Sequence, residues 1–186
     1  MSSRQQILNL IDTHFSESFG EKPFIPGQSN IPVSGRVFDG DDIKSLIDAS
    51  LDFWLTTGRF AEKFEKIFSN FLGIKYSNLV NSGSSANLIA ISSLTSPTLG
   101  DKRLMPGDEV ITVAAGFPTT LNPIIQNNLV PVFVDVLPDT YNANPNQVEK
   151  AITKKTKAIF LAHTLGNPFH ISKIRSIADK HNLWLI

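Results

Sequence analysis

Asn81-Ser82-Gly83-Ser84-Ser85-Ala86-Asn87 lies between a short apolar run that ends at Leu79-Val80 and a run of helical spacing from Leu88 to Leu94. A strand that delivers a glycine and two hydroxyl groups to the first turn of a helix leaves free N–H groups at the positive end of the helix dipole, and these favour an anion. We therefore interpret the stretch as a cup for one phosphate group. Serine-rich caps are common and most of them bind no ligand, so the rest of the chain has to support this interpretation.

The composition is that of a globular protein with one domain. The chain has 186 residues, of which 41% are hydrophobic, and its 17 basic and 17 acidic side chains cancel, so we expect no basic surface for nucleic acid. No apolar run approaches the roughly 20 residues of a membrane span, and the first residues form no signal peptide. We therefore expect a cytoplasmic protein without a membrane segment.

Cysteine and histidine usage excludes several kinds of site. The sequence contains no cysteine, which excludes disulfides, thiol catalysis and thiolate metal sites within these residues. The four histidines show no spacing typical of metal ligands, so no metal site is predicted.

The N-terminal third is predicted to be helical with one extended segment. Apolar residues recur with helical spacing in residues 2–19, and prolines and glycines interrupt residues 20–35, so residues 1–36 are expected to form a helix and an extended arm. Capping residues and glycines then mark two further helices, at about residues 41–54 and 61–71.

After residue 75, short apolar runs alternate with segments that begin at a capping residue. This alternation predicts an α/β fold with a mainly parallel sheet and right-handed crossovers. The predicted strands are Asn78–Asn81, Glu109–Val113, Pro131–Val136, Ala158–Ala162 and Leu183–Ile186, and the predicted helices are Ser84–Leu94, Pro118–Asn127, Pro145–Ile152 and Ile171–His181.

Ligands of such sheets bind beyond the carboxyl ends of the strands. That rule selects four loops as candidate parts of a site, namely Ser82–Ser85, Ala114–Phe117, Asp135–Leu137 and His163–Asn167. Gly83 has no glycine two residues away and no Gly-Lys-Ser/Thr follows, which argues against a dinucleotide site or a P-loop. Phe117 follows small residues that leave space for a flat ligand beside its ring, although a core phenylalanine is the simpler interpretation from the residues alone.

A co-linear set of motifs supports the functional interpretation. From about Phe24 to Ile186 the chain resembles the DegT/DnrJ/EryC1/StrS sugar aminotransferase family of fold-type I pyridoxal-phosphate enzymes. Within it, the chain looks most similar to the CDP-4-keto-6-deoxyglucose-3-dehydrase branch. The resemblance rests on Gly58-Arg59-Phe60, Phe64-Glu65, Leu72-Gly73, Asn81–Asn87, Pro106–Val110, Val113–Thr120, Pro131–Val136, Tyr141-Asn142 and His163–Phe169.

The resemblance implies a cofactor, pyridoxal 5'-phosphate or pyridoxamine 5'-phosphate, and residues that bind it. Gly83, Ser84 and Ser85 occupy the positions that bind the cofactor phosphate. Phe117 stands where an aromatic ring stacks on the pyridine ring. Asn167 lies in the region that contacts the ring hydroxyl group, although an asparagine before a proline is also a common turn former.

Structural roles are expected for the other polar residues near these loops. His163 is interpreted as a structural histidine, Asp135 as the cap of a turn, and the lysines at 154, 155 and 157 as a solvated face. His170 stands where relatives carry aspartate at the start of a helix, so the expected loss is a cap.

The last residues, Leu183–Ile186, resemble a buried strand, and we expect the chain to be the N-terminal portion of a larger cofactor-binding domain, with residues 37–186 belonging to it. By resemblance, the aspartate that pairs with the pyridinium nitrogen and the catalytic lysine, or histidine in the dehydrase branch, follow beyond residue 186. No catalytic residue is therefore assigned here. The resemblance also implies that the strand at Asn78–Asn81 pairs only with a later strand.

The resemblance implies dehydration at C3 of a nucleotide-linked 4-keto-6-deoxy sugar, as in lipopolysaccharide biosynthesis. A nucleotide-sugar aminotransferase is the alternative enzyme, and a non-catalytic remnant is the alternative from another class. The expected partners are the nucleotide-linked sugar, a second copy in a homodimer, and a reductase.

Overall fold

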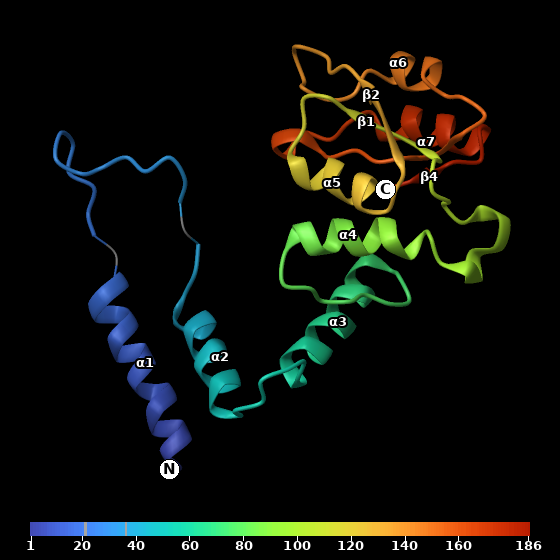
Figure 1. Ribbon diagram of the computed structural model, residues 1–186. Coiled ribbons are helices and arrows are strands. Elements are labelled where there is room, and N and C mark those ends of the chain that lie inside the picture. Colours follow the sequence, from blue (N-terminus) through green and yellow to red (C-terminus); the bar gives the residue numbers. More distant parts are fainter. Residues whose placement is uncertain (21, 36) are drawn as a thin grey trace. The chain divides into compact units, whose positions relative to one another are not determined.

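The computed structural model describes residues 1–20, 22–35 and 37–186, and the chain forms two compact units, Met1–Leu79 and Val80–Ile186 (Figure 1). The boundary predicted at residue 36, between an arm and the rest of the chain, lies outside the described residues.

The first unit contains α1 (Ser3–Phe19), α2 (Gly40–Leu51) and α3 (Arg59–Leu72). Local capping signals explain where these helices begin and end. Ser2 caps α1 with its side chain, and Asp39 and Asp42 form a capping box at the start of α2. Gly73 ends α3 in the left-handed conformation with φ 66°. The three helices predicted in the N-terminal third are therefore confirmed.

Charged side chains connect the three helices of the first unit. The guanidinium groups of Arg4 and Arg59 each bridge the carboxylates of Asp48 and Asp52. Both arginines reach Asp52 over 2.7 Å. Hydrogen bonds from Arg59, and then from Arg4, hold the pKa values of both carboxyl groups below their ordinary value. The four side chains thus form a cyclic network of ion pairs in which each arginine contacts both aspartates.

The second unit is built on a parallel sheet in the order β2-β1-β3-β4. Parallel neighbours need a crossover connection, and helices supply it between consecutive strands. The elements are β1 (Glu109–Val113), β2 (Val130–Val134), β3 (Thr156–Ile159), β4 (Trp184–Leu185), α4 (Gly83–Ser93), α5 (Pro118–Gln126), α6 (Pro145–Lys150), α7 (Ile171–Lys180) and the 3-10 turns η1 (Pro97–Lys102) and η2 (Thr164–Gly166).

Hydrophobic residues cover both faces of this sheet. In β1, Val110 packs with Ile91 and Ile124 on the side of α4 and α5, whereas Ile111 packs with Ile174 on the side of α6 and α7. Successive side chains of a strand point to opposite faces, so a continuous apolar run supplies both cores. Figure 1 shows the resulting layers, with α6 and α7 on one side of the strands and α4 and α5 on the other. The predicted α/β fold with a mainly parallel sheet is confirmed.

No strand forms at Asn78–Asn81 among the described residues, and the pairing of this segment with a later strand stays a prediction. Residues 78–81 pair with no strand in the part of the chain that the structure describes, where the outermost strands are β2 and β4. A strand is defined by the partner that accepts its backbone hydrogen bonds, and this segment has none there. The sheet of the described residues therefore has four strands instead of the predicted five.

Element boundaries differ from the predictions for local reasons. β2 ends at Val134, because Val136 forms an antiparallel bridge with Ala143 instead of continuing the ladder. α2 ends at Leu51, three residues before the predicted end, because Phe53 adopts φ 48° and cannot continue a helix.

Among the described residues, no helix is both long enough and hydrophobic enough to span a membrane.

Candidate functional site

The first turn of α4 has the geometry of an anion cup. Ser82 is the N-cap, and its Oγ accepts a hydrogen bond from the backbone N–H of Ser85 over 3.2 Å. The Ser85 hydroxyl group donates to Asn81 Oδ1 over 2.6 Å. The backbone N–H groups of Gly83 and Ser84 have no acceptor among the described residues. Two N–H groups at the positive end of an 11-residue helix are therefore free to bind an anion.

The space in front of these donors is open. A methyl group built at Gly83 would have no heavy atom within 4 Å, and Ser84 is exposed. A phosphate group needs several donors that converge and room for its oxygens, and Gly83, Ser84 and the Ser84 hydroxyl group supply both. Ser85 was predicted to bind the phosphate, but in this structure its N–H donates to Ser82 and its O–H donates to Asn81. These two bonds stabilise the cup.

A side-chain hydrogen bond joins the helix of the cup to the loop that carries Phe117. Asn87 Nδ2 donates to the backbone carbonyl of Thr119 over 3.1 Å. Thr119 lies in the first turn of α5, where the N–H of Thr120 donates to the Phe117 carbonyl over 3.0 Å. Ser84, Ser85 and Thr119 also line one shallow groove of about 170 Å³ between α4 and α5. The structure thus brings the cup and the loop before α5 together.

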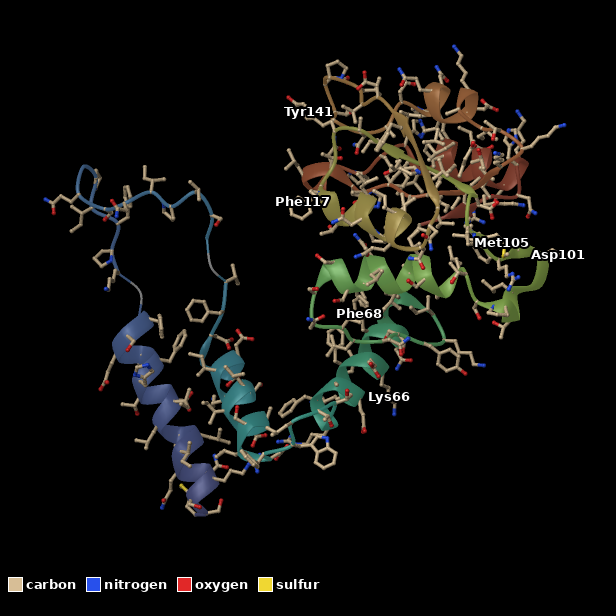
Figure 2. All side chains as sticks on the ribbon, viewed as in Figure 1. Lys66, Phe68, Asp101, Met105, Phe117 and Tyr141 are labelled. Carbon is tan, nitrogen blue, oxygen red and sulfur yellow. The ribbon has the colours of Figure 1, made fainter. Side chains whose placement is uncertain are left out.

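Phe117 is not a core residue. Its side chain is 73% exposed, and Figure 2 shows it projecting from the start of α5. The loop approaches the end of β1 closely at Gly116, where a Cβ would lie 3.2 Å from Val113 Cγ2. A glycine at this position lets the chain turn without displacing Val113. An exposed aromatic ring beside an anion cup can stack on the flat part of a ligand whose phosphate the cup holds.

Asn167 lies in the loop after β3, at the same edge of the sheet. β3 and β1 are parallel neighbours, so the loops that follow them leave the sheet at their carboxyl ends. Asn167 is exposed, its Nδ2 donates to the carbonyl of Thr140 over 3.4 Å, and its own carbonyl accepts from Asn142 Nδ2 over 3.0 Å. This loop is therefore tied to the loop that follows β2.

Other polar residues of these loops make local contacts. Asp135 Oδ1 accepts from the N–H of Val136 over 2.8 Å, as expected for a turn cap. The His163 ring packs against Phe169 with centroids 4.6 Å apart. His170 occupies the N-cap position of α7 without a side-chain cap bond, which agrees with the predicted loss of a cap.

Two asparagines that position the site were not identified from the sequence. Asn87 and Asn142 act through carboxamide contacts with residues 32 and 25 positions away. The sequence signal was present, since Asn87 ends the Asn81–Asn87 motif and Asn142 belongs to the Tyr141-Asn142 motif. Their roles depend on contacts that a motif does not reveal.

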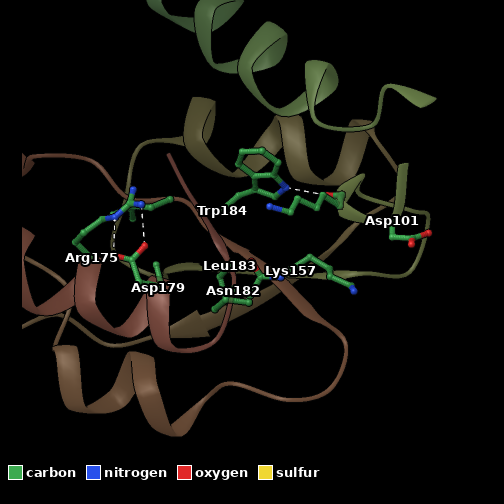
Figure 3. Close-up of a pocket in the computed structure, with 10 residues that line it drawn as sticks. Asp101, Lys157, Arg175, Asp179, Asn182, Leu183 and Trp184 are labelled. Carbon is green, nitrogen blue, oxygen red and sulfur yellow. Dashed lines mark hydrogen bonds and ion pairs between the residues drawn. The ribbon is translucent and has the colours of Figure 1, made fainter. Parts of the chain in front are cut away.

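Several larger cavities in the second unit involve none of the predicted site residues. One, of about 400 Å³, lies beside β4, where Arg175 pairs with Asp179 and Trp184 Nε1 donates to the Lys102 carbonyl (Figure 3). Another, of about 480 Å³, lies between the loop after β2 and the start of α7. The size of a cavity therefore does not identify the site. The free backbone N–H groups of the cup and the exposed Phe117 ring identify it.

The sequence profile of the DegT/DnrJ/EryC1/StrS aminotransferase family matches residues 38–186. The chain belongs to this family. The match includes the cup, the Phe117 loop and the Asn167 loop, and so covers the whole candidate site.

Two curated relatives in this family are similar to most of the chain. Lipopolysaccharide biosynthesis protein RfbH of Salmonella typhimurium is 55% identical over 183 residues, which are 98% of this chain and 42% of that protein. The dTDP-4-dehydro-2,6-dideoxy-D-glucose 3-dehydratase of Saccharopolyspora spinosa is 55% identical over 163 residues, which are 88% of this chain and 35% of that protein. The chain therefore spans about two fifths of the length of these relatives.

A solved structure of the same family has a similar fold. The GDP-4-keto-6-deoxy-D-mannose-3-dehydratase of E. coli with bound hydrated PLP is 32% identical and superimposes with a TM-score of 0.76. The alignment covers 84% of this chain and 40% of that chain. The α/β unit is thus the aminotransferase-type fold of the family.

Proposed function

We propose that the protein binds pyridoxal 5'-phosphate or pyridoxamine 5'-phosphate and removes the C3 hydroxyl group of a nucleotide-linked 4-keto-6-deoxyhexose, as part of deoxysugar synthesis for lipopolysaccharide. One observation carries this proposal. The helix with the free N–H groups of Gly83 and Ser84 is joined to the loop with the exposed Phe117 ring by the Asn87–Thr119 hydrogen bond. Membership of the family and the 3-dehydratase relative support it.

The proposed roles follow from which groups are free. The backbone N–H groups of Gly83 and Ser84 and the Ser84 hydroxyl group hold the phosphate, while Ser85 braces the cup and can contribute its hydroxyl group by turning away from Asn81. Phe117 covers one face of the pyridine ring. Asn167 donates to the ring hydroxyl group with the N–H that Thr140 does not use.

The cofactor, when bound, supplies an electron sink for carbanion chemistry at the sugar. The residues of this chain contribute binding and orientation, because the cup fixes the phosphate and the ring of Phe117 fixes the plane of the heterocycle. By resemblance, the base that moves the proton and the aspartate that pairs with the pyridinium nitrogen lie beyond residue 186. We therefore assign no proton transfer to residues 1–186.

Further parts of the proposal concern organisation and partners. Residues 1–36 are proposed to form an arm and residues 37–186 the first portion of the cofactor-binding domain. A homodimer and a reductase partner are proposed by resemblance to the dehydrase branch.

A binding measurement tests the cofactor proposal. The protein from its complete reading frame is titrated with PLP and, in parallel, with pyridoxal, which lacks the phosphate. Gly83→Ala should fold normally, because open space surrounds the new methyl group, yet weaken PLP binding by about 10- to 100-fold, because that methyl group would occupy the space through which the phosphate approaches the free N–H groups. Pyridoxal binding should change little. Ser93→Ala, at the far end of α4, is the control.

Equal PLP affinity of the wild type and Gly83→Ala would refute the cup as the phosphate site. Product analysis with a nucleotide-linked 4-keto-6-deoxyhexose distinguishes dehydration from the alternative function, that of a nucleotide-sugar aminotransferase. Loss of the C3 oxygen supports dehydration, whereas a new amino group at C4 with glutamate as donor supports transamination. A purified protein that binds PLP but gives neither product would support the non-catalytic alternative.

A further inference from the structure

Asn142 is one of the few polar residues buried in the second unit. Only 4% of its surface is exposed, and its carboxamide lies between two loops. Its Nδ2 donates to the carbonyl of Asn167 over 3.0 Å, and its Oδ1 accepts from the N–H of Thr164 over 3.3 Å. One side chain thus satisfies a donor and an acceptor of the loop after β3.

Those two backbone groups are the ends of a tight turn. The N–H of Asn167 donates to the Thr164 carbonyl over 2.9 Å, and the central residues Leu165 and Gly166 have φ 55° and φ 78°. Positive φ at both central positions is the pattern of a type I′ turn. In a hairpin, Thr164 N–H and Asn167 C=O would bond to each other, but here both are bound by the carboxamide of Asn142.

Leu165 makes this turn unfavourable by itself. A leucine in the left-handed region is strained, because its Cβ approaches the following carbonyl oxygen. The side chain is 92% exposed, so its burial does not offset the strain. The turn therefore depends on contacts made by its ends, and the carboxamide of Asn142 provides two of them.

The contact between the loops is reciprocal. Asn167 Nδ2 donates to the carbonyl of Thr140, and the backbone N–H of Asn142 donates to Thr140 Oγ1, each over 3.4 Å. Tyr141, which lies between Thr140 and Asn142 in the sequence, has φ 56°. Two loops with unfavourable backbone conformations thus hold each other in place through two asparagines.

We infer that Asn142 is the positioning residue for Asn167: its carboxamide holds the Thr164–Asn167 turn in the left-handed conformation that presents the Asn167 side chain at the cofactor site. The role requires one donor and one acceptor, so aspartate cannot replace asparagine. The part of this inference that concerns the cofactor rests on the proposed function. The part that concerns the turn does not.

Hydrogen exchange tests the turn without any cofactor. In the wild type, the N–H groups of Gly166 and Asn167 are bonded to His163 and Thr164 carbonyls and should exchange slowly. Asn142→Ala should accelerate their exchange by about 10- to 100-fold, because two partly buried backbone groups lose their partners. Asn142→Asp keeps the acceptor and loses the donor, so it should give an intermediate or equal acceleration. Asn146→Ala, at an exposed asparagine in the first turn of α6, should leave these amides unchanged.

A second substitution separates positioning from general loss of stability. Leu165→Gly removes the strain, since glycine adopts positive φ readily. In the Asn142→Ala background it should restore most of the slow exchange at Gly166 and Asn167. It should not rescue a variant weakened elsewhere, such as Ile174→Ala. If Asn142→Ala does not fold, the same comparison is made with Asn142→Asp.

The absorption spectrum of bound PLP tests the consequence for the site. Asn167→Ala should shift the absorption band and its pH dependence, and Asn142→Ala should shift both in the same direction, with partial reversal by Leu165→Gly. If the wild type binds no PLP, the proposed function fails while the exchange experiment still decides the role of Asn142. If PLP binds, Asn167→Ala shifts the band, and Asn142→Ala alters neither the band nor the exchange rates, the inference is overturned.

Discussion

The Nδ2 group of Asn87 donates a hydrogen bond of 3.1 Å to the backbone carbonyl of Thr119, across 32 residues of sequence. This bond joins the helix that carries the phosphate cup to the first turn of the helix that follows Phe117. A contact between two helices therefore links the anion donors to the loop that carries the aromatic ring.

Replacing Asn87 should loosen this connection. Asn87→Ala removes one partly buried hydrogen bond and should lower the free energy of unfolding by about 1 kcal/mol, measured by urea denaturation. PLP affinity should fall as well, because the hydrogen bond no longer holds the cup and the Phe117 loop in a fixed relative position. Asn146→Ala, at an exposed asparagine in the first turn of α6, is the control. Identical PLP affinities for the two variants would contradict the proposed role of the bond.

The cap of α4 should contribute to stability independently of any ligand. Ser82→Ala removes the Oγ that accepts from the N–H of Ser85 and should destabilise the protein by about 0.5–2 kcal/mol. Ser82→Asp, which restores an acceptor, should recover the stability but repel the phosphate group. A cap variant with low stability and unchanged α4 protection in hydrogen exchange would be inconsistent with this assignment.

The core on the α7 side of the sheet offers a test of the packing. Ile174 is fully buried against the strands, whereas Ile171 in the same helix is 50% exposed. Ile174→Ala should cost about 2–5 kcal/mol and Ile171→Ala less than about 1 kcal/mol in the free energy of unfolding. Calorimetry or urea titration measures both. Similar costs at the two positions would mean that α7 packs on the sheet through a different face.

The charge cluster of the first unit should depend on pH. Hydrogen bonds from Arg59, and secondly from Arg4, lower the pKa values of Asp48 and Asp52 in the folded state. Groups with a lowered folded pKa stabilise the fold above their unfolded pKa, about 3.9 for aspartate, and this contribution is lost as the pH falls through the folded pKa.

Arg59→Gln should therefore be less stable than the wild type at pH 6, and the difference should shrink below about pH 4. High salt should reduce it at pH 6, because the pairs are accessible to solvent. Lys63→Gln removes the same charge from an exposed position of α3 and is the control. Urea titrations at pH 6 and pH 3 measure the effect, and an equal difference at both pH values would exclude it.

The order of helices and strands after residue 75 could be predicted from the sequence, because apolar runs and capping residues act within a few residues of each other. The position of the cup before α4 was predicted for the same reason. The residues alone did not predict the exposure of Phe117, since an aromatic residue among small neighbours fits a core as well as a site, and it was the resemblance that placed its ring at the cofactor. Only the packing of the surrounding elements shows that its ring is free.

The sequence by itself determined the alternating α/β plan, the Gly-Ser-Ser turn at a helix start and the family of the chain. The tertiary structure decided that residues 78–81 form no strand among the described residues, that Asn87 connects two helices, and that Asn142 connects two loops far apart in sequence. The physical reason is the range of the interactions. A helix cap satisfies its own neighbouring N–H groups, whereas a strand or a buried carboxamide needs hydrogen-bonding partners that only folding brings within reach.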